Sequence, residues 1–159
     1  MAKLTSSPIV ADSDRKAIGL LLRRGRATWA ELGGVLKLSP PAAADRVRRL
    51  EQKGVIRGYS AVVNPDALGY PLLAFVLVTL GTQRRRVAFL KAIRQMEEIA
   101  ECHHVAGDGD YLLKVRCRGT SDLDRILVRE LKDRLGAAQT RTTIVLSTLK
   151  ETTTLPLDR

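Results

Sequence analysis

The sequence lacks the features that mark several classes of protein. It has only two cysteines, Cys102 and Cys117, with no Cys-X-X-Cys spacing, which argues against a disulfide scaffold and a four-thiolate zinc site. Its longest apolar run, residues 71–80, is shorter than the roughly 18 to 20 residues of a membrane-spanning helix. Residues 1–12 contain no continuous apolar segment of the secretory type. These absences predict a cytoplasmic protein that is neither secreted nor inserted in a membrane.

The positive charge is concentrated in the first part of the chain. The 159 residues include 27 Lys plus Arg and 17 Asp plus Glu, and 45% of them are hydrophobic, which is enough for a buried core. Residues 1–63 carry 12 basic and 5 acidic side chains, whereas residues 64–159 carry 15 and 12. This asymmetry predicts an acidic partner for the first part, with nucleic acid favoured over an anionic membrane surface.

Two helices are predicted at the start of the chain. Residues 13–24 place apolar side chains at helical spacing after the capping pair Asp12-Ser13. Thr28 and Glu31 form a capping box, which begins a short second helix that ends near Leu36. The side chains expected to point inward are Ala17, Ile18, Leu21 and Leu22 in the first helix, and Leu32, Val35 and Leu36 in the second.

A third helix follows after only two residues, Lys37 and Leu38. Ser39-Pro40 provides an N-cap and an N1 proline, and the helix is expected to bury Ala43, Val47 and Leu50 and to stop at Gly54. Two helices joined by so short a turn, the second with a basic outer face, predict a helix-turn-helix unit whose second helix enters a major groove. The basic residues on that helix are Arg46, Arg48 and Arg49, whose guanidinium groups suit phosphates and guanine edges.

The first turn of this helix is poor in hydrogen-bonding side chains. Residues 39–44 read Ser-Pro-Pro-Ala-Ala-Ala, so they allow close approach and contact with thymine methyl groups but little direct readout of bases. We therefore expect modest sequence specificity, supplemented by DNA shape and by multivalent binding.

The remainder of the chain alternates strands and helices. Residues 55–63 look like a strand that also serves as the linker, and Asn64-Pro65 marks the domain boundary, giving domains 1–63 and 64–159. Gly107-Asp108-Gly109-Asp110 has the composition of a hairpin turn. The predicted order is a strand at 72–80, a helix after 84–86 with Val87, Leu90, Ile93 and Met96 inward, strands at 99–106 and 111–117, a helix capped by Ser121 and ending at Gly136, and a strand at 142–149.

This order predicts an α+β fold with a βαββαβ, ferredoxin-like second domain. Its two helices cover one face of the sheet, and the other face needs a cover, so we expect dimerisation through it.

These fragments, taken in order, resemble the Lrp/AsnC (feast/famine) family of transcriptional regulators. The resemblance covers about residues 13–150. The matching fragments are Asp14-Arg15-Lys16, Leu38-Ser39-Pro40, Arg46-Val47-Arg48-Arg49-Leu50-Glu51, Gly54-Val55-Ile56-Arg57-Gly58-Tyr59, Leu68-Gly69 and Gly107-Asp108-Gly109-Asp110-Tyr111. Two positions depart from the family pattern: Lys37 stands where the turn usually has glycine, and Gly33 stands where helix two usually has alanine.

The resemblance implies a winged-type helix-turn-helix domain that binds double-stranded DNA, followed by a RAM domain that binds a small effector, usually an amino acid. It implies no cofactor and no metal, and it implies dimers that assemble further, often into octamers. The implied DNA-facing positions are Ser39, Pro41, Ala42, Arg46 and Arg49, and the implied effector pocket, between dimers, contains Gly107, Asp108 and Asp110 with His104, Thr142 and Thr143.

Two other functions remain open at this point. An enzyme or metal site would use Cys102, His104 and the acids Asp108 and Asp110, but no known catalytic motif accompanies them. A DNA-architectural protein without an effector is the second alternative: the alanine-rich third helix favours it, whereas the Gly-Asp-Gly-Asp turn favours an amino-acid sensor.

Overall fold

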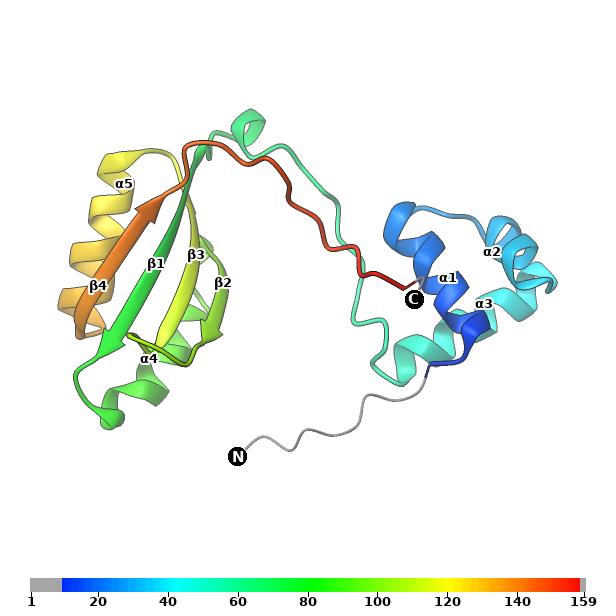
Figure 1. Ribbon diagram of the computed structural model, residues 1–159, viewed down its shortest axis with the longest axis horizontal. Helices are drawn as coiled ribbons and strands as arrows, with labels where there is room; N and C mark the ends of the chain where they lie inside the picture. Colours follow the sequence, from blue (N-terminus) through cyan, green and yellow to red (C-terminus); the bar gives the residue numbers. More distant parts are fainter. Residues whose placement is uncertain (1–9, 158–159) are drawn as a thin grey trace. The chain divides into compact units, whose positions relative to one another are not determined.

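The computed structural model describes residues 10–157, and the chain divides into two compact units (Figure 1). The second unit is Val63–Leu149, and the first contains the described residues up to Val62 together with those from Lys150 onward. The sequence placed the domain boundary after residue 63 and assigned the last residues to the second domain, whereas the structure groups them with the first. Among residues 10–157, none of the helices has both the length and the apolar composition of a membrane-spanning segment.

The first unit contains three helices, α1 (Asp12–Arg23), α2 (Trp29–Leu36) and α3 (Pro40–Gln52). The capping box that begins α2 is present, because the Glu31 backbone N–H donates to Thr28 Oγ1 and the Glu31 carboxylate accepts from the Thr28 N–H at 2.7 Å. The predicted Asp12-Ser13 cap of α1 is wrong: the helix begins at Asp12, and its N-cap residue is Ala11, which makes no side-chain cap.

The core of the first unit is small. Its fully buried members are Ala17, Leu32, Ala43 and Val47, one or two from each helix. The predicted stripe of α3 is therefore confirmed, with Leu50 also buried. The prediction for Val35 is wrong, since its side chain is 41% exposed and lies on the outer side of α2.

Both departures from the family pattern lie at the turn between α2 and α3, and the structure explains the one at Gly33. Lys37 adopts the left-handed conformation with φ 55° and ψ 46°, which is costly for a residue with a Cβ atom. A Cβ atom added to Gly33 would lie 2.6 Å from the carbonyl oxygen of Leu38. Glycine at position 33 therefore allows the turn to pack directly against α2.

The predicted strand at residues 55–63 is not formed. Among the described residues this segment has no strand pairing, and the side chain of Val62 is 97% exposed. The residue types favour a strand, but a strand needs a neighbour to satisfy its backbone hydrogen bonds, and the single chain provides none here.

The second unit is a four-stranded antiparallel sheet in the order β2-β3-β1-β4, with its helices on one face (Figure 1). The predicted βαββαβ order is confirmed. The elements are a short 3₁₀ turn η1 (Asp66–Leu68), β1 (Leu72–Leu80), η2 (Gln83–Arg85), α4 (Arg86–Ile93), β2 (Ile99–His104), β3 (Tyr111–Cys117), α5 (Thr120–Arg125) continuing as the π-helical η3 (Ile126–Arg134), and β4 (Ala137–Ile144).

Three predictions for the second unit are wrong in detail. Strand β4 begins at Ala137, five residues before the predicted start, because it pairs along almost the whole of β1. Helix α5 begins at Thr120 without a side-chain cap, so Ser121 is not its N-cap. In α4 the prediction for Ile93 is confirmed, but its buried neighbour is Phe89, whereas Val87 is 78% exposed. The 3₁₀ turn before Arg86 changes the phase of the helix.

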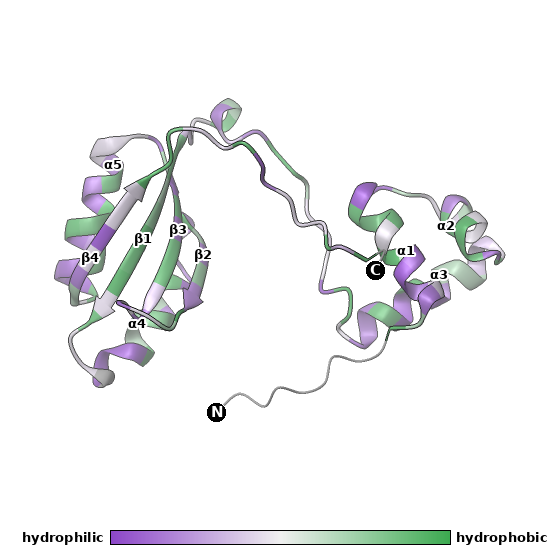
Figure 2. Ribbon diagram, in the orientation of Figure 1, coloured by the Kyte–Doolittle hydropathy of each residue, from purple (hydrophilic) through white to green (hydrophobic). Residues whose placement is uncertain are grey.

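The core of the second unit lies between the helices and one face of the sheet. It joins alternate residues of β1 and β3 to Phe89 and Ile93 of α4 and to Ile126 and Leu131 of η3. Figure 2 shows the apolar central strands β1 and β3 beside the more polar edge strands. The helix-covered face is therefore well packed, and the edges β2 and β4 carry the polar candidates for a site.

Candidate DNA-binding and effector sites

The start of α3 presents an exposed surface of small side chains. Ser39, Pro41 and Ala42 are all exposed. The Ser39 hydroxyl oxygen accepts a hydrogen bond from the Ala42 N–H at 3.4 Å, so the N-terminal turn is held in place by its own cap. Because these side chains are small, the backbone at the N-terminal end of α3 is accessible to a binding partner.

The predicted arginines of α3 fall into two groups. Arg48 and Arg49 are exposed, and the guanidinium of Arg48 contacts the exposed carboxylate of Asp45 at 2.7 Å. Such an exposed pair is weak and is easily exchanged for a phosphate. Both side chains are therefore available to an anionic partner.

Arg46 is bound within the protein. Its Nε atom donates to the Asp14 carboxylate at 2.5 Å and its Nη2 atom donates to the Ser13 hydroxyl oxygen at 2.5 Å, and the Arg46 side chain is 35% exposed. Both partners belong to the first turn of α1. Arg46 thus connects α3 to α1, a role that the pattern of arginines on α3 did not reveal.

The Gly107–Asp110 turn joins β2 to β3 and is anchored to the end of β1. The Leu80 N–H donates to Asp110 Oδ2 at 2.7 Å, and the Asp110 N–H donates to the Val78 carbonyl at 2.9 Å. A Cβ atom on Gly109 would lie 2.6 Å from Cγ of Leu77. The turn therefore packs closely on β1, and Asp110 holds it there through one of its two carboxylate oxygens.

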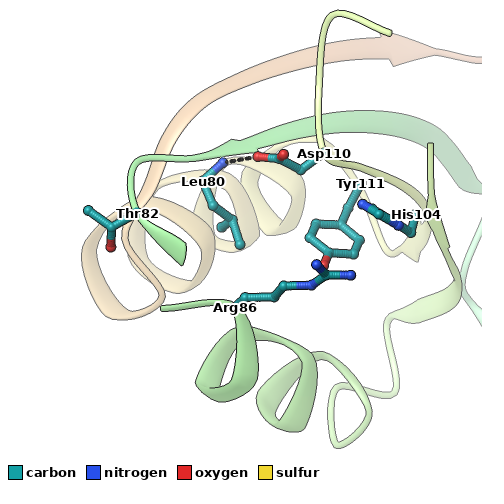
Figure 3. Close-up of a pocket in the computed structure, with 6 residues that line it drawn as sticks. All are labelled: Leu80, Thr82, Arg86, His104, Asp110 and Tyr111. Carbon is teal, nitrogen blue, oxygen red and sulfur yellow. Dashed lines mark hydrogen bonds between the residues drawn. The ribbon is translucent and has the colours of Figure 1, made fainter. Parts of the chain in front are cut away.

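A small polar cavity lies next to Asp110 on the helix-covered side of the sheet (Figure 3). Its volume is about 50 Å³. The His104 ring lies 5.2 Å from the Tyr111 ring, and the Arg86 guanidinium lies 6.0 Å from the same ring centre. The cavity is lined by Leu80, Thr82, Arg86, His104, Asp110 and Tyr111.

The hydroxyl of Tyr111 is the one buried side-chain polar atom in the described residues that has no hydrogen-bond partner. Figure 3 shows the ring of Tyr111 between His104 and Arg86. A buried hydroxyl without a partner is costly. The cavity therefore contains an unused hydrogen-bonding group together with a cation and an acid.

The structure brings together only some of the predicted effector residues. His104 and Asp110 line the cavity, whereas Asp108 is exposed and lies 4.0 Å from Arg141. Thr142 pairs with Val76 and Thr143 with Phe75, so these two neighbours point to opposite faces of β4. The backbone of Gly107, with φ 146°, belongs to the turn but does not line the cavity.

Sequence reasoning missed Arg86 and Tyr111 as cavity residues. Tyr111 belongs to the motif that indicated the turn, and the alternation of β3 places it opposite His104. Arg86 belongs to a run of three arginines at residues 84–86, and the run alone does not identify the member that points inward.

Within the second unit, no described element covers the face of the sheet opposite the helices. It displays the half-buried side chains of Phe75, Leu77 and Leu112. Next to them, Glu101 binds His103 and Lys114, each at 3.0 Å, and these two hydrogen bonds hold the pKa of the Glu101 carboxyl below its usual value. An apolar centre with a charged margin is typical of a protein–protein interface.

The geometry gives the enzyme alternative little support. Cys102 pairs with Leu113 and His104 with Tyr111, so they do share a face of β2. Burial raises the pKa of the Cys102 thiol, which disfavours the reactive thiolate. Within the residues that the structure describes, no group of three or more His, Cys, Asp or Glu side chains is placed to bind a metal.

Comparison with known protein families agrees with the two-unit structure. A model of a winged helix-turn-helix DNA-binding domain matches residues 11–57. A model of the Lrp/AsnC ligand binding domain matches residues 73–155. Together they cover the three helices of the first unit, nearly all of the sheet unit and part of the C-terminal segment.

Similar proteins include named transcriptional regulators. The leucine-responsive regulatory protein of Haemophilus influenzae is 40% identical over 91% of this chain and 88% of its own length, and that of Escherichia coli K12 is 40% identical over 89% and 88%. A Neisseria meningitidis transcriptional regulator in complex with L-methionine superposes with a TM-score of 0.87 at 29% identity, covering 94% of this chain and 97% of its own. The feast or famine regulatory protein of M. tuberculosis complexed with L-methionine superposes with a TM-score of 0.80 at 38% identity, covering 88% of this chain and 94% of its own.

Proposed function

Because the chain belongs to the Lrp/AsnC family of transcriptional regulators, we propose that the exposed surface of α3 is its DNA contact and that the Gly107–Asp110 turn forms part of its effector site. The chain is a DNA-binding transcription regulator with an effector-binding domain, and its relatives are regulators rather than enzymes. The architectural alternative without an effector is not favoured, because relatives of known structure contain L-methionine.

The DNA contact is formed by Ser39, Pro41 and Ala42 at the start of α3 and by Arg48 and Arg49 further along it. The observation that supports this assignment is the contrast in exposure between the last two side chains and Arg46. Arg48 and Arg49 bind phosphates or guanine edges, whereas Arg46 orients α3 by binding the first turn of α1.

The test compares Arg49→Ala with Arg129→Ala, which removes the same charge from an exposed position on η3. Binding to operator DNA is measured by fluorescence anisotropy over a range of salt concentrations. Loss of one phosphate contact reduces the magnitude of the negative slope of log K against log salt by about 0.9, and this is expected for Arg49→Ala alone. Equal slopes for the two variants would remove Arg49 from the contact.

Arg46→Ala needs a second measurement because it changes the folded unit itself. We expect weaker DNA binding together with a lower thermal stability of the first unit, since the variant leaves Asp14 without its ion pair. Asp14→Asn changes a residue of α1 rather than α3 and keeps a hydrogen-bond acceptor for Arg46, so it is expected to reproduce part of both effects. Loss of DNA binding in Arg46→Ala with unchanged stability would instead make Arg46 a direct DNA contact.

The effector is an amino acid bound at the Gly107–Asp110 turn. The glycine turn offers backbone N–H groups to a carboxylate, and Asp110 offers a carboxylate to an ammonium group. His104 lines the cavity beside Asp110. Asp108, Thr142 and Thr143 do not converge on this cavity within one chain, so their contribution to an effector site requires a neighbouring copy.

The regulator assembles as a dimer through the uncovered sheet face, and dimers associate further, with an octamer as the expected end state. The support is the apolar centre of that face, formed by Phe75, Leu77 and Leu112. We also propose a cytoplasmic location, where DNA and free amino acids are both present. Leu77→Glu is expected to lower the mass measured by light scattering, whereas an unchanged mass would exclude this face as the interface.

The effector assignment is tested by a thermal-shift screen against the twenty amino acids. A ligand that binds the native state raises the melting temperature by mass action. Asp110→Asn retains an oxygen that accepts from the Leu80 N–H but removes the charge, so it should abolish the shift while the unliganded melting temperature stays near that of the wild type. Asp124→Asn, at an exposed position on α5, is the control for charge alone. A full shift in Asp110→Asn would exclude an ion pair with the effector.

A further inference from the structure

The last described residues of the chain pack on the DNA-binding unit. We refer to residues 150–157 as the C-terminal strap, and they group with the first unit rather than with the sheet. A cavity of about 330 Å³ lies between the strap and α1, lined by Gly19, Leu22 and Arg23 of the helix and by residues 154–157.

Gly19 is the centre of this contact. It lies in the middle of α1, where its backbone is helical and where glycine costs about 1 kcal/mol relative to alanine. It is nevertheless buried. The atoms nearest to an added Cβ would be the Arg23 guanidinium at 3.5 Å and Leu157 Cδ1 at 3.7 Å. Because position 19 has no side chain, Leu157 can pack close to the backbone of α1 at this point.

Leu157 is the anchored apolar residue of the segment that leaves the sheet. Leu146 and Leu149 are 98% and 96% exposed, and Leu155 is 62% exposed, whereas Leu157 is half-buried. Thr154 N–H donates to Thr152 Oγ1 at 3.1 Å, which restricts the strap just before its contact with α1. The segment thus makes its apolar contact at its far end.

The segment that leads to the strap leaves the sheet at the end of β4, beside the strand that follows the linker. Ala74 of β1 pairs with Ile144 of β4, and the Val145 N–H donates to the Leu73 carbonyl at 2.9 Å. The sheet is therefore joined to the DNA-binding unit twice, through the linker to α3 and through the strap to α1. Both connections begin on the same pair of strands, and β4 also carries Thr142 and Thr143.

We propose that the C-terminal strap is a mechanical connection through which effector binding at the sheet changes the DNA-binding unit. A displacement of β4 moves Val145, from which the chain continues to the strap on α1, and a displacement of β1 moves the end of the linker. Since α1 is bound to α3 through Asp14 and Arg46, a change at Gly19 reaches the DNA-contacting helix within one packed unit. This coupling rests on the effector site proposed above.

The test uses two substitutions at position 19 of the full-length protein. Gly19→Ala places its Cβ at ordinary contact distance from Leu157 and is the matched control, whereas Gly19→Leu fills the space that Leu157 occupies. Both replacements raise helix propensity relative to glycine, so an effect confined to Gly19→Leu reports displacement of the strap. Leu157→Ser removes the same contact from the other side.

Two measurements are made on each variant. The Leu157 methyl resonance, identified by its loss in Leu157→Ser, is expected to move in Gly19→Leu and to stay near its wild-type position in Gly19→Ala. The second measurement is the ratio of the affinities for operator DNA with and without the amino acid. A wild-type response within the usual range of about 5- to 150-fold is expected to fall to within about twofold of unity in Gly19→Leu and Leu157→Ser.

Three outcomes would overturn the proposal. A Leu157 resonance unmoved in Gly19→Leu would show that the strap is not seated at Gly19 in solution. A displaced resonance with a full effector response would show that the strap transmits nothing. A wild-type protein that responds to no amino acid, with the resonance displaced as expected, would refute the proposed effector function and the transmission with it, but not the contact.

Discussion

The two units of this protein are stabilised in different ways. The core of the DNA-binding unit consists mainly of Ala17, Leu32, Ala43 and Val47. The core of the sheet unit has fourteen buried residues drawn from strands and helices. The smaller unit depends more on individual polar contacts, such as the Thr28 capping box and the Arg46–Asp14 ion pair.

This difference indicates where the molecule is able to change. A unit with few buried apolar contacts opens at lower free energy than one with a continuous core. A regulator needs its DNA-binding surface to respond and its effector domain to remain folded while it responds. The division of packing between the two units matches that requirement.

The largest expected effect comes from a matched pair of leucines, Leu32 and Leu113, both 0% exposed. Substitution of either by alanine costs about 3 kcal/mol. In Leu32→Ala this loss should unfold the DNA-binding unit while the sheet unit stays folded, whereas Leu113→Ala should leave both units folded at 25 °C. Fluorescence of Trp29, the single tryptophan, reports unfolding of the first unit, and circular dichroism reports the loss of secondary structure in both units together. Coincident unfolding in both variants would show that the units are not independently stabilised.

A smaller effect is expected at the turn between α2 and α3. Gly33→Ala places a Cβ atom 2.6 Å from the Leu38 carbonyl oxygen, and the required shift should cost about 1 to 3 kcal/mol and weaken DNA binding. Gly34→Ala is the control, because nothing lies within 4 Å of its Cβ position. It should stabilise the helix by up to about 1 kcal/mol. Urea unfolding monitored by Trp29 fluorescence measures the stability of both variants. Equal stabilities would mean that the turn can shift to accept a Cβ atom at position 33 without a cost in free energy.

In the sheet unit, polar contacts make a smaller contribution that depends on pH. The Arg125 guanidinium binds Asp122 at 2.7 Å and holds the pKa of that carboxyl below its usual value. The folded-state pKa is below the unfolded one, so the stabilisation is present above about pH 4 and is lost as pH falls further. Asp122→Asn should lower the free energy of unfolding by about 1 kcal/mol at pH 7.

The difference between Asp122→Asn and wild type should shrink when urea unfolding is repeated near pH 3. A difference that is constant between pH 7 and pH 3 would show that the Asp122 charge is not the cause.

The smallest effect is expected at Lys37, which is left-handed. Lys37→Gly removes the strain of the side chain but raises the entropy of the unfolded chain, so a net stabilisation of about 0.5 to 1 kcal/mol is expected. Lys37→Ala keeps a Cβ atom and should give no such gain. Thermal unfolding of the first unit distinguishes the two, and a destabilised Lys37→Gly would mean that the lysine side chain makes a contact that offsets its conformation.

Several parts of the fold that local sequence determines were predicted correctly, although the helix caps expected at Asp12-Ser13 and Ser121 are not formed. The Thr28–Glu31 box, the Ser39-Pro40 helix start and the βαββαβ order depend on residues close together in the chain. The strand at 55–63 was predicted wrongly because pairing requires a neighbour that local preference does not specify. Val87 was misplaced because a single 3₁₀ turn changes the helical phase of α4.

The candidate sites were less accessible to sequence reasoning. Arg46, Arg48 and Arg49 are chemically alike, and only the approach of α1 distinguishes the half-buried Arg46 from the other two. The effector residues lie on β2, β4 and a turn, so their convergence depends on strand order and on the faces that they share. Thr142 and Thr143 are adjacent in sequence, but their side chains point to opposite faces of the sheet because neighbours on a strand alternate.

The C-terminal strap also changes how the molecule is to be divided. The DNA-binding unit is assembled from both ends of the described chain, and the sheet unit is an insertion between them. A chimera that exchanges effector domains by a single junction near residue 63 would discard the piece that covers Gly19. Two junctions, one in the linker and one near Leu149, keep the DNA-binding unit whole and turn the sheet into an exchangeable cassette.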